Sequence, residues 1–444
     1  LLLLLGGIRL MLPLGSQGQG SEALLSFGFL ILAAHMVGEF AGGVGLPKIV
    51  GYMAAGVLFG PSVLGTVTQD GVARLSLVGE LAVAVIAFLA GAELRWSEVR
   101  DRGVVLLKIV IAELGLTFVA VTALVYALHS YVPALRDLPA AEVIAFAALF
   151  ASIAIVHSPA VTMALLSETG ARGPVARTTL GVVLVSDVFV VLLFTGALSL
   201  ARTLAPPPGT AVGPSVAQVA WEVLGAGLIG AILGAAVALY LRWVGRELML
   251  FAVLVAFFGL EIARLAHVEM LLTLLVMGFV TENISEHGEA LRAATERSAA
   301  PLFVVFFALA GARIDLATVA PLLPLVIPIA VVRAAAIWQG VNLGARWAGV
   351  GGDERRLVWL GLVSQVGVAI GLTAIVADAY PVRGAELSGL LLALIALNQT
   401  IGPILFRRAL AAAGETNGGA AGVADAAVPS PAEPGPTAAR PAEA

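Results

Sequence analysis

Apolar residues follow one another along most of this chain in long runs, with polar residues confined to short intervals between them. A run of about 20 apolar residues is long enough to cross the hydrocarbon core of a bilayer as a helix. The pattern predicts thirteen such segments, at 24–40, 47–64, 75–93, 103–129, 140–167, 174–201, 216–241, 247–266, 268–284, 299–315, 317–348, 356–380 and 385–411. We therefore predict an all-α polytopic membrane protein.

The composition supports this class and excludes others. Sixty per cent of the 444 residues are hydrophobic and 12% are charged, with a mean hydropathy of +1.01, far above what a water-soluble domain needs to fill its core. The net charge of −4 is scattered, which argues against a nucleic-acid surface. The absence of cysteine excludes disulfides and Cys-based metal or redox sites. Membrane lipid is the expected partner.

The two ends of the chain differ from its middle. Residues 1–23 contain a short apolar piece that fits either a signal-like remnant or a disordered leader. Residues 24–411 form the predicted membrane domain. Residues 412–444 are rich in Ala, Pro, Gly and Glu, without apolar periodicity, and predict a disordered tail. No nucleotide-binding βαβ pattern follows the last segment, so no soluble regulatory domain is expected.

The basic residues predict how the chain is oriented. If the N-terminus lies outside, fifteen Lys and Arg residues fall in or beside inner loops and seven in or beside outer loops. Cytoplasmic loops carry the excess of basic residues in membrane proteins. Thirteen spans with a cytoplasmic C-terminus are therefore expected.

One carboxylate stands out within the apolar segments. Asp187 lies in the middle of the nearly wholly apolar run 181–194, where an ionised side chain costs about 2.5–3.5 kcal/mol on insertion scales. About thirty residues upstream, Pro159 follows His157 and Ser158 inside another apolar segment, and proline removes a backbone donor and breaks a helix. A broken helix thus precedes a helix with an isolated acidic group.

A second break predicts an internal repeat. The twelfth segment contains Ser364 and Gln365, with Gly367 shortly after, and the next segment carries Asn398 where the first half carries Asp187. Secondary transporters are commonly built from inverted repeats with corresponding broken helices. Seven steps separate the fifth and twelfth segments, so the halves run in opposite senses. We predict repeats at 24–201 and 247–411, joined through a linker helix at 216–241.

The same offset relates two further buried charges. Glu113 in the fourth segment corresponds to Arg333 in the eleventh, and each lies deep in apolar sequence. Buried charges usually pair. The sequence therefore predicts a structural Glu113–Arg333 ion pair beside the two breaks.

Several stretches resemble one family of transporters. They are GLPKIVGYMAAGVLFGP at 45–61, FLAGAEL at 88–94, SP at 158–159 followed by ETGARGP at 168–174, FFALAG at 306–311, SQVGVAIG at 364–371 and LNQTIGP at 397–403. In order and spacing they resemble the monovalent cation:proton antiporter-2 family of bacterial sodium/proton and potassium/proton exchangers. The resemblance implies a thirteen-helix inverted-repeat fold in which two broken helices cross, a homodimer, a place in the bacterial inner membrane, and a carboxylate at Asp187 that binds proton and cation alternately.

Details of the expected site follow from this resemblance and from the residues. Exchangers of this kind often carry Asp or Asn at the position of Ser186, and a single carboxylate favours electroneutral one-for-one exchange of Na⁺ or K⁺ for H⁺. Backbone carbonyls freed at the breaks, with the hydroxyls of Ser158, Thr162 and Ser186, would complete an oxygen shell for the cation at Asp187. No cofactor is expected. Ser186 also fits a hydrogen bond to its own helix, and His157 fits either a pH sensor or a helix-cap or interfacial residue.

Other functions also fit a polytopic membrane protein with these features. An inverted-repeat channel or solute symporter would share the fold, and a sensor would retain it without transport. An intramembrane enzyme would use Asp187 with His157 as an acid–base pair. Too few His, Asp and Glu residues cluster in the sequence for a metal-dependent enzyme.

Overall fold

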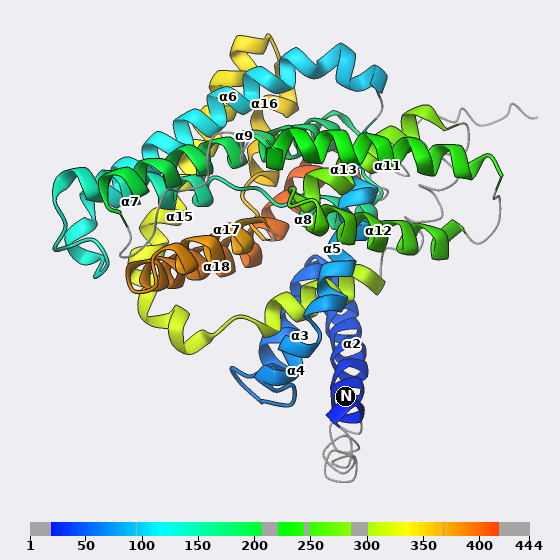
Figure 1. Ribbon diagram of the computed structural model, residues 1–444. Coiled ribbons are helices and arrows are strands. Elements are labelled where there is room, and N and C mark those ends of the chain that lie inside the picture. The colour runs from blue at the N-terminus through cyan, green and yellow to red at the C-terminus, as the bar shows by residue number, and fades with distance from the viewer. Residues whose placement is uncertain are drawn as a thin grey trace, which may run out of the picture.

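The computed structural model describes residues 19–94, 96–206, 221–243, 248–285, 301–366 and 368–416. Every regular element in these ranges is a helix (Figure 1). Seven helices are long and apolar enough to cross a membrane, and five shorter apolar helices accompany them. Each of the thirteen predicted segments contains a helix, which confirms the all-helical fold class. Gly367 and residues 417–444 of the predicted tail lie outside the described residues.

The first half of the chain supplies the helix that carries Asp187 and the first break. Its elements are α2 (Gln19–Gly43), α3 (Lys48–Phe59), α4 (Gln69–Arg74), α5 (Ser76–Ala92), α6 (Trp96–Ala127), a 3₁₀ turn (His129–Tyr131), α7 (Ala140–Ala154), α8 (Pro159–Thr169) and α9 (Pro174–Leu204). Proline occupies the first turn of both α8 and α9, where its missing N–H leaves no intrahelical bond unmade.

The second half supplies the second break. It begins with a π-helical turn (Trp221–Gly225) and continues with α11 (Ala226–Leu241), α12 (Leu248–Leu265), α13 (Met270–Ile284), an apolar helix at Pro301–Ala312, α15 (Leu316–Ala348), α16 (Gly352–Gly361), α17 (Val368–Ala379) and α18 (Arg383–Ala412). The predicted linker helix at 216–241 is described from Trp221 onward.

Both predicted breaks are present. The chain leaves the helix between α7 and α8, where the Ser158 hydroxyl caps α8 by accepting from the backbone N–H of Val161 at 3.2 Å. It leaves the helix again between α16 and α17. The Gln365 side chain donates to the carbonyl of Ala154 at 2.8 Å, so the two irregular segments lie side by side in the core.

Close helix packing fixes the position of Arg333 relative to the first half of the chain. On α15, a Cβ added to Gly340 would lie 2.5 Å from the Cα of Glu113, and one added to Gly344 would lie 2.5 Å from the Cα of Ile109. Small residues at such crossings let helix backbones approach one another in membranes. The α6–α15 contact therefore brings the two buried charges into the same region.

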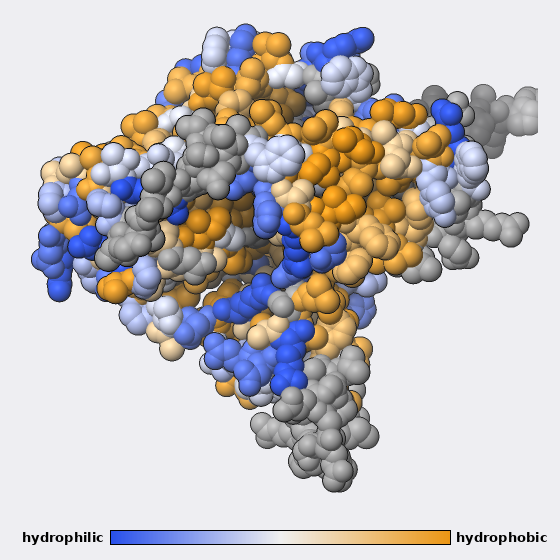
Figure 2. Space-filling model, in the orientation of Figure 1, coloured by the Kyte–Doolittle hydropathy of each residue, from blue (hydrophilic) through white to orange (hydrophobic). Residues whose placement is uncertain are grey.

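A large apolar area is exposed on the surface of α11 to α13. Figure 2 shows hydrophobic residues gathered over the helices α11 to α13. Large side chains exposed on α11 and α12 include Leu228, Ile232, Leu239, Leu254 and Phe258. A hydrocarbon solvent explains this exposure, because a membrane-facing surface needs no polar covering.

Candidate functional site

Asp187 is buried at the centre of the described helices. It lies on α9 with 9% of its surface exposed, and its Oδ1 has no hydrogen-bond partner. The first turn of α9 is held by Glu415, whose carboxylate accepts from the backbone N–H groups of Val175 at 2.7 Å and Ala176 at 2.8 Å. A buried carboxylate oxygen without a partner is rare and marks a position that a ligand or a proton can occupy.

A narrow cavity connects Asp187 with both breaks. Its volume is about 30 Å³, room for about one water-sized particle. Ser158 and Pro159 from the first break and Val366 from the second line it together with Asp187. The structure therefore brings together the carboxylate and the two irregular segments that the sequence indicated.

The predicted hydroxyl ligands have local hydrogen bonds. The Ser186 hydroxyl donates to the carbonyl of Val183 at 2.7 Å, and the Thr162 hydroxyl donates to the carbonyl of Ser158 at 3.0 Å. Of the three, Ser158 lines the narrow cavity, whereas Thr162 and Ser186 are buried outside its lining. A hydroxyl oxygen that donates its hydrogen still accepts or coordinates through its lone pairs, so all three stay predicted cation ligands.

The second break is ordered by side-chain amides. Asn398 on α18 donates to the side-chain oxygen of Gln365 at 2.7 Å. Gln365 in turn donates to Ala154, so a chain of amides links α18 with the first break. The Ser364 hydroxyl is buried and has no partner. Asn398 thus occupies a supporting position beside the second break.

Glu113 and Arg333 do not form the predicted ion pair, because each binds other partners. Glu113 lies 3.1 Å from His157 Nε2 and accepts from the Thr117 hydroxyl at 3.1 Å. The His157 Nδ1 lies 2.7 Å from the carbonyl of Leu362, which only accepts, so Nδ1 carries a proton. His157 therefore joins α6 to both breaks, an interfacial role, while Ser158 caps α8.

Arg333 instead donates hydrogen bonds to backbone carbonyls of both breaks. Its guanidinium donates to the carbonyls of Ala154 at 2.5 Å and Val156 at 3.0 Å, and to those of Val363 at 2.8 Å and Leu362 at 3.4 Å. Broken helices leave carbonyls that water cannot reach, and five fixed N–H donors suit them. Arg333 still attracts Glu113 electrostatically without touching it.

Comparison with known proteins shows the family to which the chain belongs. Residues 27–412 match the family described as the transmembrane sodium/hydrogen exchanger. The chain belongs to the sodium/proton exchanger family. The exchanger fold is that of a transporter and not of an enzyme, so the intramembrane-enzyme alternative is wrong.

Solved structures show the same fold. The exchanger is similar to the sodium proton antiporter MjNhaP1 from Methanocaldococcus jannaschii at pH 8, with a TM-score of 0.66 and 17% identity over 88% of this chain and 96% of that one. An electron-microscopy structure of the same antiporter gives a TM-score of 0.69 and 15% identity, covering 88% and 97% of the two chains. No curated protein sequence matches the chain significantly. The family match over residues 27–412 and the shared fold confirm the predicted resemblance to cation/proton exchangers.

Proposed function

We propose that the exchanger moves Na⁺ or K⁺ against H⁺ by binding proton and cation alternately at Asp187. The observation that carries this proposal is a buried carboxylate with an unpartnered oxygen, in a narrow cavity between two broken helices. One carboxylate balances one positive charge at a time. Competition between proton and cation for Asp187 is then the exchange.

The surrounding groups support a hard monovalent cation. Ser158 lines the narrow cavity together with Asp187 and offers a hydroxyl oxygen. Carbonyls of the breaks that Arg333 does not bind would complete the oxygen shell. Thr162 and Ser186 remain further candidates. Since Ser186 adds no second charge, we propose electroneutral one-for-one exchange.

Replacing Asp187 tests the assignment. The full chain is reconstituted in proteoliposomes, and proton movement is recorded with a pH-sensitive dye after Na⁺, K⁺ or Li⁺ is added. Asp187→Asn keeps the shape of the side chain but cannot exchange a proton for a cation, so we expect coupled movement to fall to the level of empty vesicles. Asp137→Asn is the matched control, because Asp137 is exposed beside Arg136. Coupled exchange by folded Asp187→Asn would make the assignment wrong.

The same vesicles distinguish the remaining alternatives. A channel would pass cations without moving protons against a gradient. Electroneutral exchange predicts an unchanged rate when the membrane potential is clamped at different values with K⁺ and valinomycin. A rate that depends on the potential would contradict one-for-one stoichiometry.

Orientation and assembly belong to the same proposal. The excess of basic residues in alternate loops supports a cytoplasmic C-terminus. We propose a place in the bacterial inner membrane, as the family resemblance implies. We propose a homodimer, as the family resemblance implies; cross-linking of the protein in membranes tests it, and a single-copy band at all cross-linker concentrations would contradict it.

A further inference from the structure

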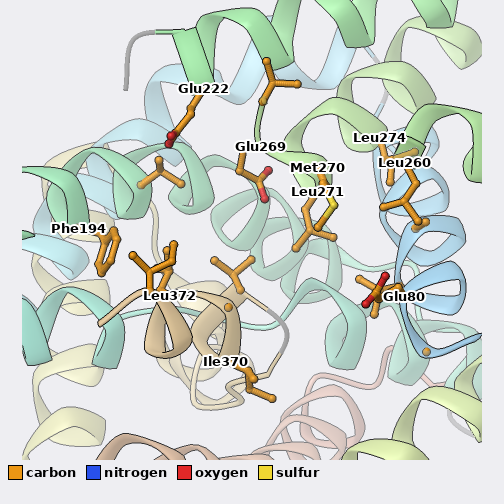
Figure 3. Close-up of a pocket in the computed structure, with 18 of the residues that line it drawn as sticks. Glu80, Phe194, Glu222, Leu260, Glu269, Met270, Leu271, Leu274, Ile370 and Leu372 are labelled. Atoms are coloured by element: carbon orange, nitrogen blue, oxygen red, sulfur yellow. The ribbon is translucent and has the colours of Figure 1, made fainter. Parts of the chain in front are cut away.

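A second, larger cavity lies next to Asp187. Its volume is about 660 Å³. The carboxylates of Glu80, Glu222 and Glu269 line its mostly apolar wall (Figure 3). It also shares four wall residues with the narrow cavity at Asp187, namely Val83, Leu271, Phe306 and Val368. The large cavity therefore adjoins the narrow cavity of Asp187 across these four apolar side chains, which form the constriction between the two.

Glu269 is the acidic residue of the large cavity whose charge acts on Asp187. It lies in the turn between α12 and α13, where its carboxylate caps α13 by accepting from the backbone N–H of Leu272. Its own backbone N–H donates to the carbonyl of Glu222 at 3.1 Å, which holds the turn against the π-helical turn. A negative charge on Glu269 disfavours a negative charge on Asp187 across the wall that the two cavities share.

The other charges of the large cavity are placed differently. Glu80 is paired with Arg264. Arg202 and Arg313 also line the cavity, so it is not uniformly acidic. Glu222 lines the same cavity as Glu269, and a negative charge on one disfavours a negative charge on the other. A cation placed between Glu269 and the constriction would relieve both repulsions, the one with Asp187 and the one with Glu222.

We propose that Glu269 forms a second cation-binding station, which holds a monovalent cation in the large cavity before it passes the constriction to Asp187. This inference rests on the proposed function, because a cation waiting at Glu269 is useful only if Asp187 receives it. A carboxylate beside a water-accessible cavity holds a partly hydrated cation and raises its local concentration. Removal of Glu269 therefore weakens cation capture, while the exchange step at Asp187 is retained.

The test separates capture from turnover. Initial rates of proton movement are measured in proteoliposomes of the full chain over a range of Na⁺ concentrations, and again with K⁺. For Glu269→Gln, whose amide oxygen still caps α13, we expect the half-saturating cation concentration to rise about three- to tenfold, as for the loss of one charge several ångströms away in a partly hydrated protein. The maximal rate should stay within about twofold of the original. Glu269→Asp should give an intermediate value.

The matched control is Glu261→Gln. Glu261 lies on α12, is paired with Arg264 and does not line the large cavity, so its replacement should leave half-saturation unchanged. An unchanged half-saturation in Glu269→Gln, or a fall in maximal rate alone, would overturn the proposal and leave Glu269 a helix cap. Equal shifts in both Glu→Gln variants would also overturn it.

A binding measurement covers variants that transport poorly. Thermal unfolding of detergent-solubilised protein is followed as Na⁺ is added, since a bound ion stabilises the folded state. Glu269→Asp should need more Na⁺ than the unchanged protein for the same stabilisation, and an equal requirement would contradict the proposal. Failure of the proposed function is seen separately, as coupled exchange that survives in Asp187→Asn.

Discussion

At the scale of the residue, Arg333 holds the two breaks together through their backbone carbonyls. Its guanidinium binds four carbonyls from two breaks, and a lysine ammonium has neither the reach nor the fixed geometry to do so. We expect Arg333→Lys to lower the free energy of unfolding by about 2–4 kcal/mol, because buried carbonyls lose their donors. Thermal unfolding in detergent measures the change.

The control for this substitution is Arg346→Lys. Arg346 lies on the same helix, but it is exposed in the last turn of α15. Its replacement should leave the unfolding temperature nearly unchanged. Equal stability of both variants would mean that the carbonyls of the breaks find other donors.

The sequence predicted which polar residues are buried better than it predicted their partners. Glu113, Arg333 and Asp187 were each recognised from a charge inside apolar sequence, and each is buried. The partner of Arg333 was wrong because the competing acceptors are backbone carbonyls, which every residue carries and no residue letter marks. His157 took the place of Arg333 beside Glu113 because the first break brings its ring between α6 and Leu362.

At the scale of the element, the α6–α15 crossing depends on two glycines. Gly340 and Gly344 leave room for the backbone of α6 at Glu113 and Ile109. We expect Gly344→Ala to force the helices apart and to lower the free energy of unfolding by about 1–3 kcal/mol, as overpacking of a tight contact does. Exchange should fall in parallel, since Arg333 shifts with α15.

Gly115→Ala is the matched control for the crossing. Gly115 lies on α6, and a Cβ added there would meet no atom within 4 Å. Alanine is the better helix former, so the unfolding temperature should stay the same or rise slightly. A loss as large as that in Gly344→Ala would show that α6 tolerates no added methyl group on either face.

The sequence predicted both helix breaks from local changes in composition. Pro159 marked the first break, and Ser364 with Gln365 marked the second, because proline and polar residues interrupt otherwise continuous apolar helices. The amide chain from Asn398 through Gln365 to Ala154 was not predicted. Such a contact depends on how two distant helices face each other, which spacing along the chain does not encode.

At the scale of the whole molecule, the large cavity makes one end of the bundle accessible. Thr195 on α9 lines this cavity, and the proposed orientation puts its opening outside the cell. The chain contains no cysteine, so Thr195→Cys introduces a single thiol. A membrane-impermeant maleimide added to intact cells should label Thr195→Cys and leave Arg346→Cys, in the last turn of α15, unlabelled.

Opening the cells provides the complementary measurement. Arg346→Cys should then react as well, because Arg346 is exposed. Labelling of Arg346→Cys in intact cells, with Thr195→Cys protected, would reverse the proposed orientation. Protection of Thr195→Cys under both conditions would show that the cavity is closed to a reagent of that size.

The sequence did not predict either cavity. Glu269 lies in a short turn between two apolar helices and has no neighbouring motif. Its position in the wall of a cavity results from the packing of α5, α9, α13 and α17 around a common space. Residues that line a cavity between helices share no period along the chain, and so no pattern identified them.

The Glu415 carboxylate, just after the end of α18, accepts hydrogen bonds from the backbone at the start of α9. Gly414 turns the chain back after α18 with a φ of 69°, and Gly173 leaves space that a Cβ would take from the Glu415 side chain. The segment that follows α18 is therefore fastened to the first turn of the helix that carries Asp187, so a displacement of the end of α18 is transmitted to the start of α9.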